Sequence, residues 1–458
     1  MTALKLRLEA ADVTRWALVA GYLLVLALNL PGHLSVDPVL SLYEGRFHER
    51  ITWGPPFHAW VLGVFDALLA GTSLYVVATS LMLFGGWMWL VRMSGRVSWF
   101  AVAAAIAVVL TPNVLVYQGI VWKDVFFANT ATLGFICLIG ASRAWAEGRR
   151  PLIALGGAAL LFAMASLVRQ NGLVAWLPAA AVIAWALRDK GWRTAASWAG
   201  GWLVLVALIA QTLSVSAIPG ESDNKAISRG VRIVQHYDLA GAIAHDPTLP
   251  LSHIDAANPK ADDILRARAG QRWSPDRVDW LGADPVVGRT LWKLPDETVR
   301  AEWLDLIREH PGTYLQVRLA DFQWVFATPI IDRCLPVHVG VTGPPERMAA
   351  LKLAERRDPR DDQLYNYTTW FLDTPVMSHV AYGLLALMVA GALLVRRRPE
   401  DIPVIALQVA ALGFTASFLV ISIACDYRYL YFLDVAALTG LLYLSLDPTG
   451  WRRSARSA

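Results

Sequence analysis

The chain has 458 residues, of which 56% are hydrophobic and only 17% are charged, and its mean hydropathy is +0.43. A soluble globular domain carries about a quarter charged residues. The composition therefore excludes an ordinary soluble protein and indicates an integral membrane protein. The formal net charge of +4 is less informative than the distribution of Lys and Arg among the loops.

Apolar runs long enough to cross a bilayer, which takes about 20 helical residues, recur along the chain. The first follows a mixed-charge head and is not followed by a small-residue cleavage site, which predicts a signal anchor that is retained. The two runs between residues 151 and 187 are among the shortest. The ten runs are 14–31, 72–92, 98–117, 123–142, 151–168, 172–187, 194–216, 375–395, 402–424 and 428–446.

Alternate connections between these runs are rich in Lys and Arg, which is typical of cytoplasmic loops. With the N-terminus inside, all five basic connections fall on the cytoplasmic side. The pattern predicts a multi-pass protein of the cell inner (cytoplasmic) membrane with both termini in the cytoplasm. The five connections read "VRMSGRVS", "SRAWAEGRRP", "LRDKGWR", "VRRRPED" and, at the tail, "WRRSARS".

The predicted outer side consists of a first loop (32–71), short corners and one large segment. In that segment "LPDETVRAEWLDLIREHP" has acids in its first turn, an apolar face and a proline stop, and "PGTYLQVRLADFQWVFATP" is a second amphipathic stretch. The predicted fold class is an all-α polytopic membrane protein with about ten transmembrane helices. Its parts are an N-terminal module of about seven spans (1–216), a mostly helical extracytoplasmic domain (217–374) and a C-terminal module of about three spans (375–458).

The first outer loop predicts a helix that lies in the plane of the membrane, because "PVLSLYEGRFHERI" has an apolar and a charged face. The stretch "WGPPFHAWVLGVFDALLA" predicts a further short helix after it. The side chains expected to face lipid are Val39, Leu40, Tyr43 and Phe47, and those expected to face water are Glu44, Arg46, His48 and Arg50.

Ionisable residues recur where the predicted spans meet the outer surface. Four short stretches carry them: "SVD", "VWKDVFF", "SLVRQNG" and "CDYRYLYF". Charges at such depths are costly unless they are paired or face a cavity, so they are candidates for function. The residues are Asp37, Lys123, Asp124, Arg169, Asp426 and Arg428.

Three of these residues are cations suited to an anionic lipid headgroup. Lys123, Arg169 and Arg428 can neutralise a phosphate. If that phosphate is the leaving group of a sugar transfer, the cations also stabilise the charge that it gains in the transition state. Asp37 is then placed to accept the proton of an acceptor hydroxyl. Attack opposite the phosphate would invert the anomeric carbon.

Several expected signatures of other enzymes are absent from the sequence. It has no Gly-rich phosphate loop and no HExxH. Its inner loops are only a few residues long, too short for a nucleotide-binding domain. These features argue against a nucleotide-sugar donor and favour a polyprenyl-phosphate sugar presented from the membrane.

The chain resembles the C-class (GT-C superfamily) membrane glycosyltransferases, a group that includes protein mannosyltransferases and the lipid A aminoarabinose transferase. The resemblance rests on the acid after the first span, on "WGPPFHAW", on "KD" at the start of a middle span and on "DYRY". It implies an outer-face active site and a polyprenyl-phosphate-linked donor. The partners would be that donor, a glycan, lipid or protein acceptor, and membrane lipids, with no nucleic acid.

The resemblance also assigns individual residues. Asp37 matches the catalytic acid of the first loop; many members carry an Asp-Glu pair there, so a second acid would come from Glu44 or elsewhere. Some members bind a divalent metal ion near a further carboxylate, for which Asp124 is the nearest match, and the metal question stays open. His58 and Tyr429 complete the substrate-binding candidates.

Simpler structural explanations exist for most of these residues. Asp37 can merely cap a helix, Lys123 and Asp124 can pair locally, and Arg428 can pair with Asp426.

Other residues are expected to have no part in the chemistry. The histidines of the first loop (His33, His48 and His58) lack metal-ligand spacing and are expected to be solvated or interfacial. Cys334 and Cys425 are far apart in the sequence and are expected to be free thiols.

Two other functions compete with sugar transfer. A transporter or flippase of lipid-linked saccharides should show repeat symmetry and charges near the bilayer midplane, and the sequence shows neither. A polysaccharide polymerase or ligase would use the same donor class but transfer whole oligomers. The sequence does not separate this last function from transfer of a single sugar.

Overall fold

The computed structural model describes residues 9–52, 54–217, 223–277 and 279–448. Within these ranges the regular elements are helices, and extended backbone is limited to three isolated bridges. The chain forms two compact units. The first comprises Met1–Pro219, Val337–Phe414 and Leu430–Ala458, and the second comprises Gly220–Pro336 and Thr415–Tyr429.

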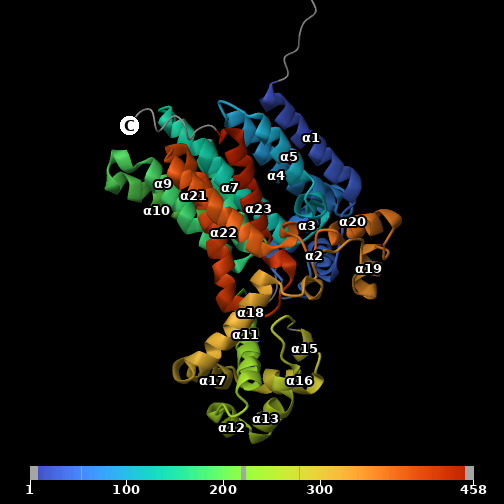
Figure 1. Ribbon diagram of the computed structural model, residues 1–458. Coiled ribbons are helices and arrows are strands. Elements are labelled where there is room, and N and C mark those ends of the chain that lie inside the picture. The colour runs from blue at the N-terminus through green and yellow to red at the C-terminus, as the bar shows by residue number, and fades with distance from the viewer. Residues whose placement is uncertain (1–8, 53, 218–222, 278, 449–458) are drawn as a thin grey trace, which may run out of the picture. The chain divides into compact units, whose positions relative to one another are not determined.

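Most of the first unit is built from apolar helices (Figure 1). The last turns of α22 belong to the second unit. The helices are α1 (Ala10–Asn29), α2 (Val36–Phe47), α3 (Pro56–Leu68), α4 (Ser73–Met93), α5 (Trp99–Val109), α6 (Pro112–Leu115), α7 (Lys123–Ala146), α8 (Leu152–Val168), α9 (Trp176–Ala186), α10 (Trp192–Ser216), α19 (Pro345–Leu351), α20 (Pro359–Thr369), α21 (His379–Arg396), α22 (Ile402–Ile421) and α23 (Tyr431–Leu446), with short 3₁₀ turns such as η1 (Tyr117–Gly119) and η2 (Gln170–Ala175).

Seven helices in the described part of the chain are long and apolar enough to cross a membrane, and eight if the bent pair Trp99–Val109 and Pro112–Gly119 is one span. The fold is therefore that of an all-α polytopic membrane protein, as the composition predicts. The runs 151–168 and 172–187 form shorter helices. A helix such as α8, with 17 residues, is about 25 Å long, less than the roughly 30 Å of the hydrocarbon core. The count of ten spans stays a prediction.

Helix α7 is the centre of the first unit, and most of its residues are buried. It packs against α8 and also against α4 and α23, which lie beside it in Figure 1. Aromatic rings fill these contacts: Phe127 lies against Phe414 and Phe432, and Phe135 lies edge-on to Phe162. Because α7 is held on all these sides, its first residues have a fixed position.

Helix α2 packs on protein more closely than a helix in the membrane plane would require. Its Gly45 crosses α3 in backbone contact, since a Cβ atom there would lie 2.2 Å from the carbonyl oxygen of Ala59. Arg46 pairs with Asp66 of α3 and donates a hydrogen bond to the carbonyl of Leu351, 2.7 Å away.

The predicted faces of α2 are partly wrong. Val39, expected to face lipid, is fully buried against protein, and Glu44, expected to face water, is also buried. The amphipathic pattern of a short helix does not show which of its faces another segment will cover.

The second unit is a helical domain with its own hydrophobic core. Two of its helices are those that the sequence predicts: Val299 and Leu306 of α17 are buried, and α18 follows after a short break. The helices are α11 (Asp223–His245), α12 (Ser252–Ala257), α13 (Pro259–Ile264), α14 (Gly270–Arg272), α15 (Asp279–Gly282), α16 (Pro285–Lys293), α17 (Asp296–Glu309) and α18 (Pro311–Ala327).

Residues 337–374, predicted to lie in the extracytoplasmic domain, pack as part of the first compact unit, and the boundaries of that domain stay a prediction. Cys334 and Cys425 form a disulfide across 91 residues, so the prediction of free thiols is wrong. The fold brings Thr415–Tyr429 back onto Gly220–Pro336, and separation along the chain does not reveal this return.

Candidate functional site

Helices α2 and α7 begin side by side. Trp122, the residue before α7, donates its indole N–H to the hydroxyl of Ser35, the residue before α2, at 3.0 Å. The backbone N–H of His33 donates to the carbonyl of Gly119 at 2.9 Å, and the N–H of Val121 donates to the carbonyl of His33 at 3.0 Å. These bonds tie the start of one helix to the start of the other.

This pairing brings predicted site residues together. Asp37 is the second residue of α2, and Lys123 and Asp124 are the first two of α7. The buried ring of His58 lies close to the starts of both helices: burial and the charge of Lys123 together lower the pKa of His58 to about 3, although the charge of Asp37 acts in the opposite direction. The hydroxyl of Tyr75, 3.1 Å from Nε2, orients that ring.

Arg169 supplies a second cation at the start of α7. It follows the last residue of α8, and its guanidinium pairs with the carboxylate of Asp124. The two side chains are 11% and 2% exposed, respectively. The N-termini of α2 and α7 add partial positive charge. We call Asp37, His58, Lys123, Asp124 and Arg169 the α2–α7 cluster.

The accessible member of the α2–α7 cluster is a carboxylate. Asp37 is exposed, while Lys123 is partly exposed and Asp124 is buried. Helix α2 begins at Val36 with Ser35 as its N-cap residue, so Asp37 lies in the first turn rather than at the capping position. A carboxylate open to solvent beside two cations can accept a proton while the cations hold an anion.

Glu44 lies on the same helix but makes contacts of a different kind. One of its carboxylate oxygens accepts the backbone N–H groups of Ile51 and Thr52, at 2.8 and 2.6 Å. The other lies 3.4 Å from Arg50. Glu44 therefore holds the connection between α2 and α3, and its use as a second acid stays a prediction.

Asp426, Arg428 and Tyr429 form a separate group in the second unit. Arg428 pairs with Asp426 at 3.0 Å, as the simpler explanation predicts, and its guanidinium lies 5.8 Å from the centre of the Tyr429 ring. The neighbouring Cys425 is held by the disulfide. That this group acts together with the α2–α7 cluster stays a prediction.

The first-loop histidines are less solvated than the sequence predicts. His33 and His58 are buried, so the expectation is wrong for both, and only His48 is exposed. Both buried rings are held by hydrogen bonds to neighbours from other segments, Asn29 and Tyr75. Such partners compensate the loss of water and cannot be identified from spacing along the loop.

The α2–α7 cluster does not form a metal-ligand set. Across the described residues, no three His, Cys, Asp or Glu side chains gather as a site for a metal ion. Asp124 is paired with Arg169 and lies next to Lys123. A divalent cation prefers several oxygen ligands without competing cations, so these residues do not fit one.

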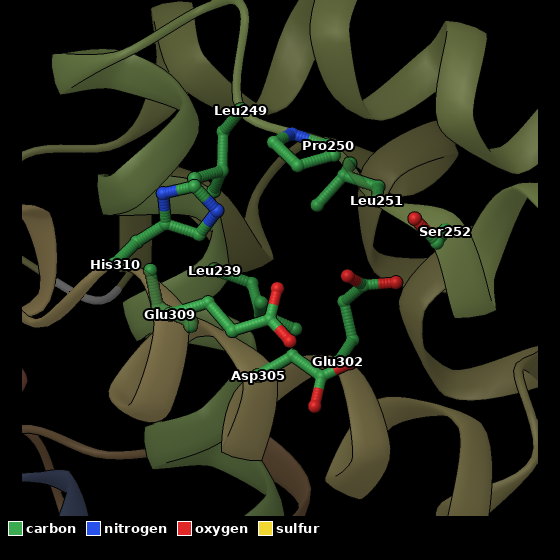
Figure 2. A pocket seen from close by; sticks show the side chains of 10 residues that line it. Leu239, Leu249, Pro250, Leu251, Ser252, Glu302, Asp305, Glu309 and His310 are labelled. Atoms are coloured by element: carbon green, nitrogen blue, oxygen red, sulfur yellow. The ribbon is translucent and has the colours of Figure 1, made fainter.

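A small pocket in the second unit holds none of the predicted site residues (Figure 2). Glu302, Asp305 and Glu309 project into it from α17. Glu302 accepts the backbone N–H groups of His253 and Ile254 at 2.9 Å each, and Asp305 lies 2.8 Å from the ring of His253. Two of the three acids thus fasten α12 to α17.

The first unit contains a buried chain of hydrogen-bonded polar side chains that was not predicted from the sequence. It links α7, η1, α6, α23 and α21 through hydrogen bonds of 2.6 to 3.0 Å. Isolated polar residues inside apolar runs are the signal that could have revealed it. The members are Asn129, Gln118, Tyr431, Asn113, Asp434 and His379.

The fold is that of a polytopic membrane protein. Where α2 and α7 begin, it holds two cations, Lys123 and Arg169, and an exposed carboxylate, Asp37. No protein-family model and no curated protein matches the sequence. Among solved structures, the chain is similar to the archaeal oligosaccharyltransferase AglB from Archaeoglobus fulgidus, in complex with an inhibitory peptide and a dolichol-phosphate. The identity is 15% and the TM-score 0.41, over 97% of this chain and 51% of that one. The chain spans about half the length of AglB, and a likeness of this size assigns neither fold nor function.

Proposed function

We propose that this protein is a membrane glycosyltransferase of the C class. It transfers a sugar from a polyprenyl-phosphate-linked donor to an acceptor at the outer face of the cytoplasmic membrane. The α2–α7 cluster is the observation that carries the proposal. Residues from α2, α3, α7 and the end of α8 meet there, and the donor's phosphate and the acceptor's hydroxyl each find a group of suitable chemistry.

Lys123 and Arg169 bind the donor's phosphate in this proposal. Both belong to helix ends that are held in place by tertiary contacts. Pre-placed cations stabilise the negative charge that the phosphate oxygen gains as the glycosidic C–O bond breaks. Asp124 orients Arg169 through their ion pair. Arg428, with Asp426 and Tyr429, is a further donor-binding group if the second unit contributes to the site.

Asp37 is the general base. Its carboxylate takes the proton of the acceptor hydroxyl as that oxygen forms a bond to the anomeric carbon. The electrons of the broken C–O bond leave on the polyprenyl phosphate, so charge and atoms balance. Attack from the side opposite the phosphate inverts the anomeric carbon. His58, buried and neutral, is influenced by the charges of both Asp37 and Lys123 and acts as a packing and orienting group.

The disulfide supports an extracytoplasmic location of the second unit. Structural disulfides persist in oxidising compartments and are rare in the cytosol, so Cys334 and Cys425 favour an extracytoplasmic second unit. With the basic loops inside, both termini are cytoplasmic in this proposal. The basic tail and the first eight residues of the mixed-charge head lie outside the described residues.

The test is an assay of purified protein with a polyprenyl-phosphate monosaccharide in lipid nanodiscs. We expect mass spectrometry to detect free polyprenyl phosphate together with a glycosylated acceptor from the membrane extract. In sealed vesicles, movement of intact donor without bond cleavage would instead identify a transporter or flippase. Products extended by whole oligosaccharides would identify a polymerase or ligase. Neither cleavage nor movement with any polyprenyl-phosphate sugar would refute the proposal.

A further inference from the structure

The start of α2 is held by a segment from a distant part of the sequence. The N–H of Leu34 donates to the carbonyl of Gly340, and the N–H of Thr342 donates to the carbonyl of Leu34, both at 2.9 Å. Val341 and Arg356 exchange two backbone hydrogen bonds of 2.8 and 3.1 Å. We call residues 340–361 the brace, because this turn lies along the chain that leads into α2.

The imidazole of His33 connects α1 to the brace. It is fully buried, and its Nδ1 accepts the backbone N–H of Gly340 at 3.0 Å. Its Nε2 lies 3.0 Å from the side-chain oxygen of Asn29. Because Nδ1 accepts, the proton of the neutral ring belongs on Nε2, which then donates to Asn29. Both ring nitrogens are therefore engaged.

The imidazole ring of His33 is neutral near pH 7. The pKa of His33 is lowered to about 3, mainly by burial and also by the charges of Arg356, His338 and Arg360. Asp358 acts in the opposite direction. A ring that stays neutral keeps Nδ1 as an acceptor, so its bond to the brace does not depend on pH near neutrality.

Two arginines of the brace hold the carbonyls just before His33. Arg356 donates to the carbonyl of Gly32 at 3.1 Å and pairs with the buried Asp361 at 3.2 Å. Arg360 donates to the carbonyl of Leu30 at 2.8 Å. The turn between α1 and α2 is thus fastened at successive residues.

The close fit of the brace depends on a glycine. Gly340 has a φ of +86°, and a Cβ atom there would lie 2.2 Å from the carbonyl oxygen of Arg356. A side chain at this position would strain the backbone and separate the two strands of the turn. Position 340 therefore requires glycine, even though glycine loses more conformational entropy on folding than other residues.

We propose that His33 is a positioning residue for the base Asp37. Its backbone is bonded to the segment that leads into α7, next to Lys123, and its ring is bonded to the brace. Asp37 follows four residues later. His33 thereby sets where the base lies relative to the cations that bind the donor. This inference rests on the proposed function.

The test compares two substitutions of one residue. His33→Ala removes both ring bonds, and we expect kcat to fall about 10- to 100-fold, as small misplacements of reacting groups do. The donor KM should stay within about twofold, since Lys123 and Arg169 are untouched. His33→Asn keeps an acceptor near the position of Nδ1 and should restore most of kcat. His48→Asn, at an exposed position of the same loop, is the matched control.

A second, milder variant guards against misfolding of His33→Ala. Arg360→Gln removes the hydrogen bond to Leu30 at a side chain that is 33% exposed, and it should lower kcat several-fold with the same donor KM. Wild-type kcat in His33→Ala, or in Arg360→Gln if His33→Ala does not fold, overturns the inference. A loss of donor affinity as large as the loss of kcat would also overturn the inference.

The outcome also separates this inference from the proposed function. If Asp37→Asn is inactive while His33→Ala works at the wild-type rate, only the positioning role fails. If Asp37→Asn keeps full activity, the proposed base is wrong and the role of His33 fails with it.

Discussion

Each unit of the protein holds an arginine bound to a carboxylate, but the two groups have different surroundings. In the second unit Arg318 pairs with Asp238 and Asp321, and these side chains are 1% exposed or less. Its guanidinium also donates to the carbonyls of Val420 and Ser422 at 3.0 Å. In the first unit the Asp124–Arg169 pair lies at the start of α7, which begins beside α2 and its exposed Asp37.

The difference separates a structural group from a candidate site. We call Arg318, Asp238 and Asp321 the Arg318 group. It is closed, because these side chains are surrounded by protein atoms and a ligand cannot reach them. It joins α11 and α18 to the segment that leads to the disulfide. The α2–α7 cluster is open, and its exposed carboxylate, Asp37, is the proposed base. Removing one partner of a buried ion pair leaves an uncompensated charge and is strongly destabilising, so such a group is expected to affect stability.

The largest expected effect is on the open cluster. Asp37→Asn should lower the rate of sugar transfer by about 10² to 10⁴, the usual contribution of a general base, while the thermal unfolding midpoint stays unchanged. Asp189→Asn, at a side chain that is 84% exposed, is the control. Wild-type activity in Asp37→Asn would show that Asp37 is not the base, and exposure would then no longer distinguish a functional cluster from a structural one.

The closed group should respond in stability instead. Arg318→Ala leaves two buried carboxylates without their cation, which typically costs about 3 to 5 kcal/mol. We expect a clearly lower unfolding midpoint, measured by Trp fluorescence of the purified full-length protein. Arg289→Ala, at an exposed residue of the same unit, should have no effect. Loss of donor binding by Arg318→Ala without loss of stability would contradict a closed structural group.

A smaller effect is expected on donor binding. Arg169→Ala removes hydrogen bonds to a charged phosphate, worth about 1.5 to 3 kcal/mol, so donor affinity should fall about 10- to 100-fold. Arg149→Ala, at a side chain that is 69% exposed, is the control, and calorimetry with polyprenyl phosphate is the measurement.

Arg428→Ala sharpens this comparison between the units. A comparable loss of affinity would bring the second unit into the site, whereas unchanged affinity in both variants would rule out the proposed phosphate role.

The smallest effect concerns pH. Burial raises the pKa of Asp238 to about 6 and that of Asp321 well above its usual range, although Arg318 acts in the opposite direction. The folded protein therefore holds protons that the unfolded chain has lost, so its stability should fall as pH rises from about 4 through 6 and, because of Asp321, above 6.

Asp321→Asn tests the origin of this pH dependence. It removes one of the two carboxylates, so the unfolding midpoint should vary less between pH 5 and pH 8 and should be higher than that of the wild type at pH 8. An unchanged pH profile would show that the raised pKa of Asp321 is not a source of the pH dependence.

Several elements could be predicted because their signals are local. The apolar runs identify the long helices, and the acids and prolines of "LPDETVRAEWLDLIREHP" mark α17 within a residue or two. The candidate residues Asp37, Lys123, Asp124 and Arg169 were found because charge at the end of an apolar run is unusual. Other features had no such signal: Glu44 is bound to the backbone of a later turn, and Cys334 meets Cys425 across 91 residues.

The sequence by itself determined the class of fold, because in lipid every backbone polar group must be satisfied within its own segment, and helices do this locally. It also determined which side chains are candidates for chemistry. Only the tertiary structure decided that α2 and α7 begin side by side, that residues 340–361 hold the turn at His33, and that Arg318 is closed off. These contacts join segments separated by dozens to hundreds of residues, and neither helical periodicity nor local charge encodes which distant surfaces will meet.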